Sequence, residues 1–221
     1  MDYGMFHVEH GYIEPLTQYN KALRQRNAAL RSSQLGVARS YNRVLSDLAA
    51  AIHLDRQSYI DTLNAVLQLT LAKLDVNFPV NLTLSAGMDP GKDLELQLKK
   101  KETVDLKRGY TSVGVHRADL VVRSESVLAA HRLSRGQQKV LVYALKIAQS
   151  NLFQEKTGNL PILMVDDLTA ELDSRHLGKM VQLFDDLGLQ VFITLLSANR
   201  ITGIANPGLF HVEHGVVNRT S

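Results

Sequence analysis

The strongest chemical signal in the sequence is a pair of adjacent carboxylates, Asp166 and Asp167, which follow the apolar run "ILMV". A short, continuously apolar run predicts a buried strand of a parallel sheet, and ligands bind outside the carboxyl ends of such strands. There Asp166 would bind Mg²⁺ beside nucleotide phosphates, and Asp167 would orient or deprotonate an attacking water. The alternative is a buried strand that simply ends in an acidic loop.

A second signal is "LSRGQQK" at residues 133–139. Ser134 and Gly136 stand immediately before a helical pattern, where free backbone N–H groups and the positive end of the helix dipole attract an anion. The hydroxyl of Ser134 adds a further donor. The alternative is an ordinary helix N-cap at Ser134.

The residues around these two signals alternate between helical and strand patterns. Amphipathic helices are expected across "RGQQKVLVYALKIAQSNLFQEK" and "SRHLGKMVQLFDDL". The runs "LPILMVDD" and "LQVFITLL" are expected to be buried strands, and "GLFHVEHGVV" is expected to be a final hairpin. Strands that alternate with helices indicate a parallel sheet with helical crossovers.

A helical arm is expected upstream of these elements. Apolar residues recur every seven positions from Leu16 to Ala51, a stripe typical of a helix packed along its length against another. Ser32, Ser33 and Gly36 interrupt the stripe, so a helical hairpin and one long rod are both open. A further helical stretch carries on one face the apolar residues Tyr59, Leu63, Val66, Leu67, Leu71 and Leu74.

Strand patterns return after the arm. Val80, Leu82 and Leu84 alternate as in a strand, "AGMDPGKD" is expected to be a turn, and "LELQL" to resume the strand pattern. The segment "TSVGVHRADLVV" is expected to form another hairpin.

The word "FHVEHG" occurs twice, at residues 6–11 and 210–215. Its alternation predicts a strand in both places, and on a strand His7 and His10 point to opposite faces. A zinc site needs convergent ligands, so a single copy does not favour one. The sequences that flank the two copies differ, which favours chance convergence over duplication.

The composition restricts the chemistry and the location expected of the chain. The 221 residues carry a formal net charge of +3 and contain no cysteine, which excludes disulfides, thiolate metal sites and cysteine nucleophiles. Neither a signal-peptide pattern nor an apolar run long enough to span a membrane is present, so a cytoplasmic protein without a membrane partner is expected.

The order and spacing of the two chemical signals resemble those of ABC-type ATPase heads in the SMC-like DNA-repair families. "LSRGQQK" is similar to their signature loop, "ILMVDD" to their Walker B strand and "TAELD" to their D-loop. Together with "FHVEHGYIEPLTQYNKALRQRNAALR" and "TSVGVHRADL", these motifs resemble the RecF family over nearly the whole chain. The resemblance implies a partial α/β head of the P-loop NTPase class with an inserted helical arm. Residues 1–13 would be a remnant strand of the head, 14–75 an antiparallel helical hairpin, and 76–221 the C-terminal part of the head.

The same resemblance implies roles for individual residues. Ser134, Gly136 and Gln137 would contact the γ-phosphate of ATP bound to a partner subunit. Asp166 would bind Mg²⁺ and Asp167 would be the catalytic carboxylate. Asp173, at the end of the D-loop, would lie at the junction of an ATP-dependent homodimer.

One part of an ATPase head is missing from the sequence. No G-x-x-x-x-G-K-[ST] phosphate loop occurs, and the nearest look-alike, "GMDPGKD" at residues 87–93, is one residue too short between its glycines. It is expected to be a turn that leads into a strand. We therefore expect an N-terminally truncated chain that is inactive alone, although the family is a weak DNA-dependent ATPase. Val115, where the family usually has proline, and "ITLLSANR", which lacks the polar residue expected after the last core strand, also disfavour turnover.

Basic residues concentrate between residues 99 and 139, where ten Lys and Arg accompany four acids. Such a surface can bind a phosphate backbone without reading sequence, and the alternative is a solvated face. The DNA-binding candidates are Lys99, Lys100, Lys101, Lys107, Arg108 and Arg117. By resemblance the chain would bind single-stranded or gapped DNA and act with recombination mediator proteins in gap repair and the SOS response. The alternative function is a non-catalytic fragment that retains only DNA or partner binding.

Overall fold

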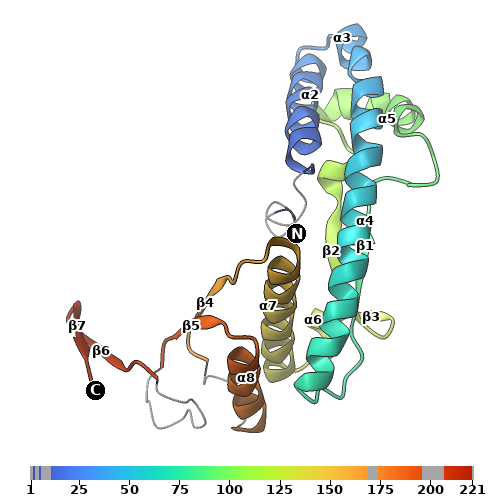
Figure 1. Cartoon of the computed structure of the whole chain (residues 1–221). Helices are drawn as coiled ribbons and strands as arrows, with labels where there is room; N and C mark the ends of the chain where they lie inside the picture. Colours follow the sequence, from blue (N-terminus) through green and yellow to red (C-terminus); the bar gives the residue numbers. More distant parts are fainter. Residues whose placement is uncertain (1, 3–4, 6–10, 169–173, 196–206, 221) are drawn as a thin grey trace.

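The computed structural model describes residues 2, 5, 11–168, 174–195 and 207–220. Its longest element, α4 (Asn42–Lys73), runs through most of the molecule, with α2 (Ile13–Arg31) and α3 (Leu35–Ser40) beside one end and α7 (Arg135–Thr157) beside the other (Figure 1). One continuous apolar core joins α2, α4 and α7, because α4 contributes buried residues along its whole length, while α3 packs through Ala38 into a small separate cluster with Ala29 and Leu30. Within the described residues, no helix is long and apolar enough to cross a membrane.

The helical arm is a hairpin and not a rod. Helix α2 ends at Arg31, Ser33 adopts a left-handed φ of 57°, and the amide of Gln34 donates to the carbonyl oxygen of Ala29 at 2.8 Å. The chain then reverses through α3 into α4. The seven-residue stripe therefore breaks at the turn, and Val37 and Val44 are about half exposed (48% and 47%). Of the predicted α4 face, Val66 is half-buried and the other five residues are buried.

Three antiparallel strands pack against the middle of α4 in the order β1 (Asn81–Ser85), β2 (Asp119–Ser124) and β3 (Val127–Leu128). The predicted strand at Val80–Leu84 is thus confirmed. The hairpin expected within "TSVGVHRADLVV" is wrong, because Val115–Arg117 form a short 3₁₀ helix (η1) and β2 pairs with β1 and β3 instead.

The expected strand at "LELQL" is also wrong, because these residues begin helix α5 (Leu94–Arg108). The alternation of leucines imitates a strand, but Leu94 and Leu98 are buried on one helical face and Leu96 is 57% exposed. Asp93 caps the helix by accepting a hydrogen bond from the amide of Glu95 at 2.7 Å, which lowers the pKa of its carboxyl group. The look-alike "GMDPGKD" therefore leads into a helix, and its last residue is used as a cap.

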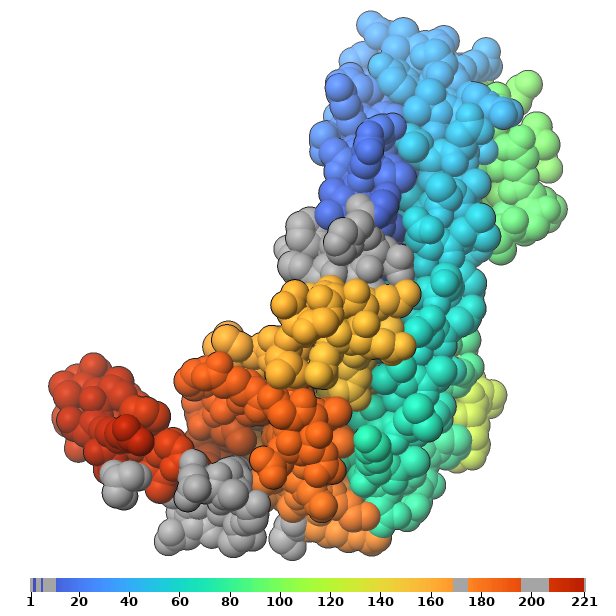
Figure 2. Space-filling view, in the orientation of Figure 1, coloured from blue at the N-terminus to red at the C-terminus, as the bar shows by residue number. Residues whose placement is uncertain are grey.

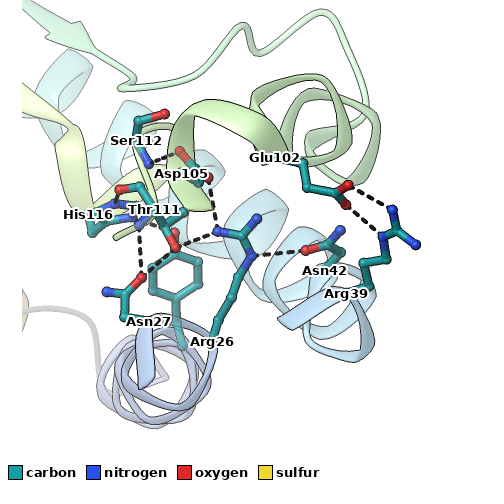
Figure 3. Close-up of polar contacts among 10 residues, drawn as sticks. Arg26, Asn27, Arg39, Asn42, Glu102, Asp105, Thr111, Ser112 and His116 are labelled. Carbon is teal, nitrogen blue, oxygen red and sulfur yellow. Dashed lines mark hydrogen bonds and ion pairs between the residues drawn. The ribbon is translucent and has the colours of Figure 1, made fainter. Parts of the chain in front are cut away.

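A buried ion pair holds α5 against the helical hairpin (Figure 3). Arg26 of α2 donates from Nη1 to Asp105 Oδ2 at 3.0 Å and to Thr111 Oγ1 at 2.7 Å, and from Nε to Asn42 Oδ1 at 3.0 Å. Asp105 also accepts from the amide of Ser112 at 3.0 Å. Both charged side chains are almost fully buried (2% and 0% exposed), so every one of these hydrogen bonds is needed to offset their desolvation.

A second buried arginine connects α4 with the N-terminal residues and η1. Arg56 donates to the Tyr12 hydroxyl at 2.7 Å, to the carbonyl oxygen of Val115 at 2.6 Å and to Asp2 at 3.0 Å. His116, the next residue of η1, contacts Tyr19 Oη through Nδ1 at 2.8 Å and the Thr111 carbonyl oxygen through Nε2 at 3.0 Å. A carbonyl only accepts, so the His116 proton lies on Nε2, and burial lowers the pKa of this imidazole.

The last third contains the expected parallel pair. Strand β4 (Ile162–Val165) pairs in parallel with β5 (Gln190–Ile193), and α8 (Ser174–Asp186) precedes β5 in the chain. Both strands were expected to be buried, but Ile162, Met164 and Phe192 are 60%, 86% and 55% exposed. Within the described residues, apolar packing covers only the other face of this sheet, where Val165 is buried and Leu163, Val191 and Ile193 lie against the core.

The predicted final hairpin is confirmed as β6 (Phe210–Glu213) and β7 (Val216–Arg219), which pair antiparallel. All eight strand residues are exposed, and the hairpin projects away from the rest of the molecule (Figure 2). The earlier copy of the hexapeptide, predicted to be a strand, spans residues 6–11, and residues 6–10 are outside the described residues. The division of the chain into head and arm stays a prediction.

The first prediction concerns the buried pair. Arg26→Met leaves Asp105 charged and unpaired in the core, so we expect the free energy of unfolding to fall by about 3–5 kcal/mol in urea titrations. The double variant Arg26→Met/Asp105→Leu removes both charges and should recover part of that loss. A matched control is Arg39→Met, which breaks an exposed pair with Glu102 and should cost much less. Equal losses for Arg26→Met and Arg39→Met would contradict the prediction.

Candidate functional site: an acidic turn beside a capped helix

The first component of the candidate site is the N-terminus of α7. Ser134 is the N-cap, and its hydroxyl accepts a hydrogen bond from the amide of Gln137 at 3.3 Å. The Gln137 side chain reciprocates by accepting from the amide of Ser134 at 2.9 Å, which completes a capping box. The N-cap interpretation of this segment is confirmed. The anion-binding interpretation stays open, because the N-terminal end of this 23-residue helix is exposed at Ser134 and Gln137.

The second component is the turn after β4, which holds the two predicted carboxylates. Asp166 is exposed and Asp167 is half-buried with a left-handed φ of 47°. Such a conformation is uncommon outside glycine, although aspartate adopts it more readily than most residues. The turn is therefore held by bonds from neighbouring elements and not by the preference of its own backbone.

Helix α7 supplies one of those bonds. Lys139 Nζ donates to the carbonyl oxygen of Asp167 at 2.9 Å, so the helix that begins at the capping box lies directly against the acidic turn. Tyr143, one helical turn further on, is also near the turn. Burial first, and then the negative charges of Asp167 and Asp166, raise the pKa of its hydroxyl. The sequence analysis missed Lys139 and Tyr143 as neighbours of the turn, although their spacing from Ser134 places them on successive turns of the predicted helix.

Strand β5 supplies the remaining bonds through Thr194. The hydroxyl of Thr194 accepts from the amide of Asp167 at 2.9 Å and donates to Asp166 Oδ1, and its own amide donates to the carbonyl oxygen of Val165 at 3.0 Å. The sequence analysis expected the strand to continue through residue 196 with no polar residue at its end. The expected end of the strand is wrong, because β5 ends at Ile193 and Thr194 stands at its carboxyl end. The lack of a polar residue that senses the γ-phosphate stays a prediction.

The two carboxylates have the right chemistry for Mg²⁺, which prefers carboxylate, phosphate and water oxygens. Within the described parts of the chain, no three His, Asp or Glu side chains gather closely enough to hold a metal ion. One or two carboxylates completed by nucleotide phosphates is the usual Mg²⁺ site of ATP-dependent enzymes. The residues present fit a Mg²⁺ ion that arrives with a nucleotide.

The other predicted site residues lie elsewhere. Asp173, the predicted dimer-junction residue, is outside the described residues. The exposed DNA-binding candidates Lys99, Lys100, Lys101, Lys107 and Arg108 lie on α5, at the opposite end of the helical hairpin from β4 and β5 (Figure 1). Arg117 is exposed on η1. Within one chain the basic helix and the acidic turn do not meet.

The charges of α5 are sorted between its two faces. The three acids on the hairpin side have arginine partners: Asp105 pairs with Arg26, Glu102 with Arg39 at 2.7 Å, and Glu95 with Arg43 at 3.9 Å. Hydrogen bonds from Arg39 lower the pKa of the Glu102 carboxyl group. Because the acids face the hairpin arginines, the outward face of α5 keeps an excess of positive charge.

The prediction for this site tests the capping role of Ser134. Ser134→Ala removes the hydroxyl that accepts from Gln137, so the free energy of unfolding should fall by about 1 kcal/mol. Ser134→Asp should keep the cap and the stability, because aspartate caps about as well as serine. Urea titrations of both variants test this, and an equal loss in Ser134→Asp would contradict the capping role.

Comparison with known proteins finds similarity along the whole of this chain. No family model matches the chain. It is 39% identical over 230 residues to "DNA replication and repair protein RecF" of Pseudomonas paraeruginosa, and 36% identical over 220 residues to that of Thioalkalivibrio sulfidiphilus. The first match covers 100% of this chain and 62% of the relative, and the second covers 98% and 61%.

Comparison with solved structures also finds RecF proteins. A structure described as the recombination mediator protein RecF-ATP in the RecFOR pathway matches 99% of this chain and 61% of its own, with a TM-score of 0.81 and 24% identity. A second one, described as RecF-ATPrS, matches 97% and 60%, with a TM-score of 0.78 and 26% identity. The chain therefore spans about three fifths of the length of the relatives it matches, and along its own length it is similar to RecF proteins in sequence and in fold.

Proposed function

We propose that the chain provides part of a RecF-type DNA replication and repair protein, with half of a composite ATP site and a DNA-binding helix. The observation that carries the proposal is the acidic turn of Asp166 and Asp167, fixed directly against the helix that starts with "LSRGQQK". The match to RecF proteins along the whole of this chain supports it. An ABC-type head needs both of these elements, the acidic turn and the signature helix. The pathway assignments, namely gap repair, the SOS response and recombination mediator partners, rest on the family alone.

The chemistry of the ATP site is divided between chains. Asp166 would hold Mg²⁺, which when bound neutralises charge on the phosphates, and Asp167 would orient or deprotonate the attacking water. Ser134, Gly136 and Gln137 would face the γ-phosphate of ATP bound to a second copy, where the exposed end of α7 favours negative charge. The loop and lysine that cradle the β- and γ-phosphates are not among the 221 residues, so they must come from outside them.

DNA would bind on the outward face of α5. The basic residues there are exposed, and the described residues include no acid paired with Lys99, Lys100 or Lys101. Lysines that contact phosphates release counterions, which gives affinity without sequence preference. A surface of this kind suits the backbone of single-stranded or gapped DNA.

A second candidate function is a non-catalytic DNA- or partner-binding module. The capping box favours it, because Ser134 and Gln137 already satisfy each other without a nucleotide. In this alternative the acidic turn is structural, and α5 is the functional surface. DNA affinity that depends on salt but not on ATP would support this second candidate.

The DNA prediction uses charge reversal at α5. Lys99→Glu/Lys100→Glu/Lys101→Glu should weaken binding to single-stranded DNA and reduce the slope of log K against log salt by about 2, since each lost phosphate contact accounts for about 0.7. Fluorescence anisotropy between low and moderate salt measures both quantities. The matched control Lys73→Glu/Lys146→Glu/Lys156→Glu changes the net charge equally at exposed sites away from α5 and should have a much smaller effect. Equal effects of the two triple variants would show that only net charge matters.

The ATP prediction concerns Asp167. In the 221-residue chain, Asp167→Asn should change no measurable ATP turnover, because the phosphate cradle is not among these residues. In a chimaera that adds the remaining length of a Pseudomonas RecF protein, the same change should lower turnover at least ~100-fold while ATP binding persists. Steady-state hydrolysis and nucleotide binding are measured on both proteins. Unchanged turnover in the chimaera would remove Asp167 from its proposed role.

A further inference from the structure

Thr194 occupies a position in the acidic turn that the family resemblance does not assign. The residue directly follows β5, and three hydrogen bonds connect it to the consecutive residues Val165, Asp166 and Asp167 at the end of β4. Its amide donates to Val165, and its hydroxyl oxygen lies 2.9 Å from the amide of Asp167 and 2.5 Å from Asp166 Oδ1. Lys139 holds the carbonyl oxygen of Asp167 from α7, and Thr194 holds the Asp167 amide and the Asp166 carboxylate.

The directions of these hydrogen bonds follow from the groups involved. An amide only donates, so the hydroxyl oxygen of Thr194 accepts from Asp167. The hydroxyl has a single hydrogen, and the ionised Asp166 carboxylate only accepts, so that hydrogen points at Asp166 Oδ1. One hydroxyl therefore fixes two things at once: the orientation of the Asp166 carboxylate and the backbone of Asp167.

Each of these two effects bears on the proposed chemistry. With Oδ1 held by Thr194, Oδ2 of Asp166 remains for a cation, in the way that neighbouring groups orient metal-binding carboxylates in many sites. Asp167 has a left-handed φ of 47°. Its own amide donates to the Thr194 hydroxyl, and its own carbonyl oxygen accepts from Lys139. A side chain on such a turn points in a fixed direction only while those bonds persist.

We propose that Thr194 is a positioning residue of the ATP site, which sets the Asp166 carboxylate for a divalent cation and holds the backbone from which Asp167 projects. The inference rests on the proposed function, since it assumes that Asp166 binds the cation. A purely structural role, in which Thr194 only joins β5 to β4, would also explain the hydrogen bonds. The two roles differ in what the hydroxyl does for cation binding in a folded chain.

The test is Mn²⁺ binding to the 221-residue chain without nucleotide, followed by the paramagnetic broadening of the amide signals of Asp166 and Asp167. Thr194→Val keeps the shape and removes the hydroxyl, so Mn²⁺ should bind about 10-fold or more weakly, as when a metal ligand loses its supporting partner. Thr194→Ser restores the hydroxyl and should return the affinity to within about threefold of the parent. Thr194→Ala provides a second hydroxyl-free variant in case the valine variant does not fold.

Two controls complete the experiment. Thr62→Val removes a hydroxyl that donates to the Ser58 carbonyl oxygen on the exposed side of α4, and it should leave Mn²⁺ affinity unchanged. Asp166→Asn removes the proposed ligand and should abolish the broadening. Circular dichroism and the dispersion of the amide spectrum establish that each variant is folded.

The outcomes are distinguishable. If Asp166→Asn abolishes broadening but folded Thr194→Val or Thr194→Ala binds like the parent, the positioning role is overturned and the cation site stands. If the serine variant binds as weakly as the valine variant, the methyl group and not the hydroxyl is responsible, and the proposal fails. If Asp166→Asn binds Mn²⁺ as well as the parent, the cation site of the proposed function is itself wrong.

Discussion

The buried pair of Arg26 and Asp105 is the interaction on which the arrangement of the helical hairpin depends. A charge this deeply buried is tolerated only when its hydrogen-bonding capacity is met, and here Asn42 and Thr111 complete the shell. The four groups come from α2, α4, α5 and the segment that follows α5. Their geometry therefore fixes how α5 lies on the hairpin, with its buried leucines beneath it.

The orientation of α5 determines which of its charges reach solvent. Asp105 faces Arg26 in the core, and Glu102 and Glu95 face Arg39 and Arg43 at the rim. If α5 were rotated by half a turn, lysines would face the hairpin arginines and acids would face solvent. The same pair that stabilises the hairpin thus determines the sign of the exposed surface. In this part of the molecule, the Arg26–Asp105 pair therefore determines both the helix packing and the surface proposed to bind DNA.

Gly109 ends α5 with a left-handed φ of 71°. A Cβ at this position would lie only 2.9 Å from Arg31 Cγ, so the close approach of α5 to the end of α2 requires glycine.

Sequence reasoning predicted well wherever one periodicity was long or unambiguous. The long helices α2, α4 and α7, the parallel pairing of β4 with β5 and the final hairpin all follow from such patterns. "LELQL" was predicted wrongly because its three alternating leucines satisfy a strand pattern. The burial of Asp105 on the same helix depends on Arg26, which lies 79 residues away in the chain. The exposed face of β4 and β5 was also missed, because an apolar run indicates burial but does not say which surface provides it.

The acidic turn shows the same limit more clearly. Asp166 and Asp167 were found because two carboxylates after an apolar run are a local signal. Thr194 was not found, because its importance depends on parallel pairing between strands that are 28 residues apart and on where β5 ends. Lys139 needed in addition the packing of α7 against that turn. Candidate catalytic residues can be recognised in the sequence, whereas the residues that hold them in place depend on tertiary contacts.

The N-terminus of α7 joins these arguments, because its capping box and its proposed phosphate contact use the same residues. The hydrogen bond from the Gln137 amide to Ser134 is long, at 3.3 Å, and therefore weak, whereas the reciprocal one from the Ser134 amide is 2.9 Å. A helix leaves its first amides without intrahelical partners, so the amides of Arg135 and Gly136 remain for an anion even while the box is closed. The Ser134 hydroxyl accepts from Gln137 through a lone pair, so its own hydrogen would remain for a charge-assisted hydrogen bond to an anion. Capping and the proposed phosphate contact would then be compatible at one helix end, and Lys139 connects that end to the acidic turn.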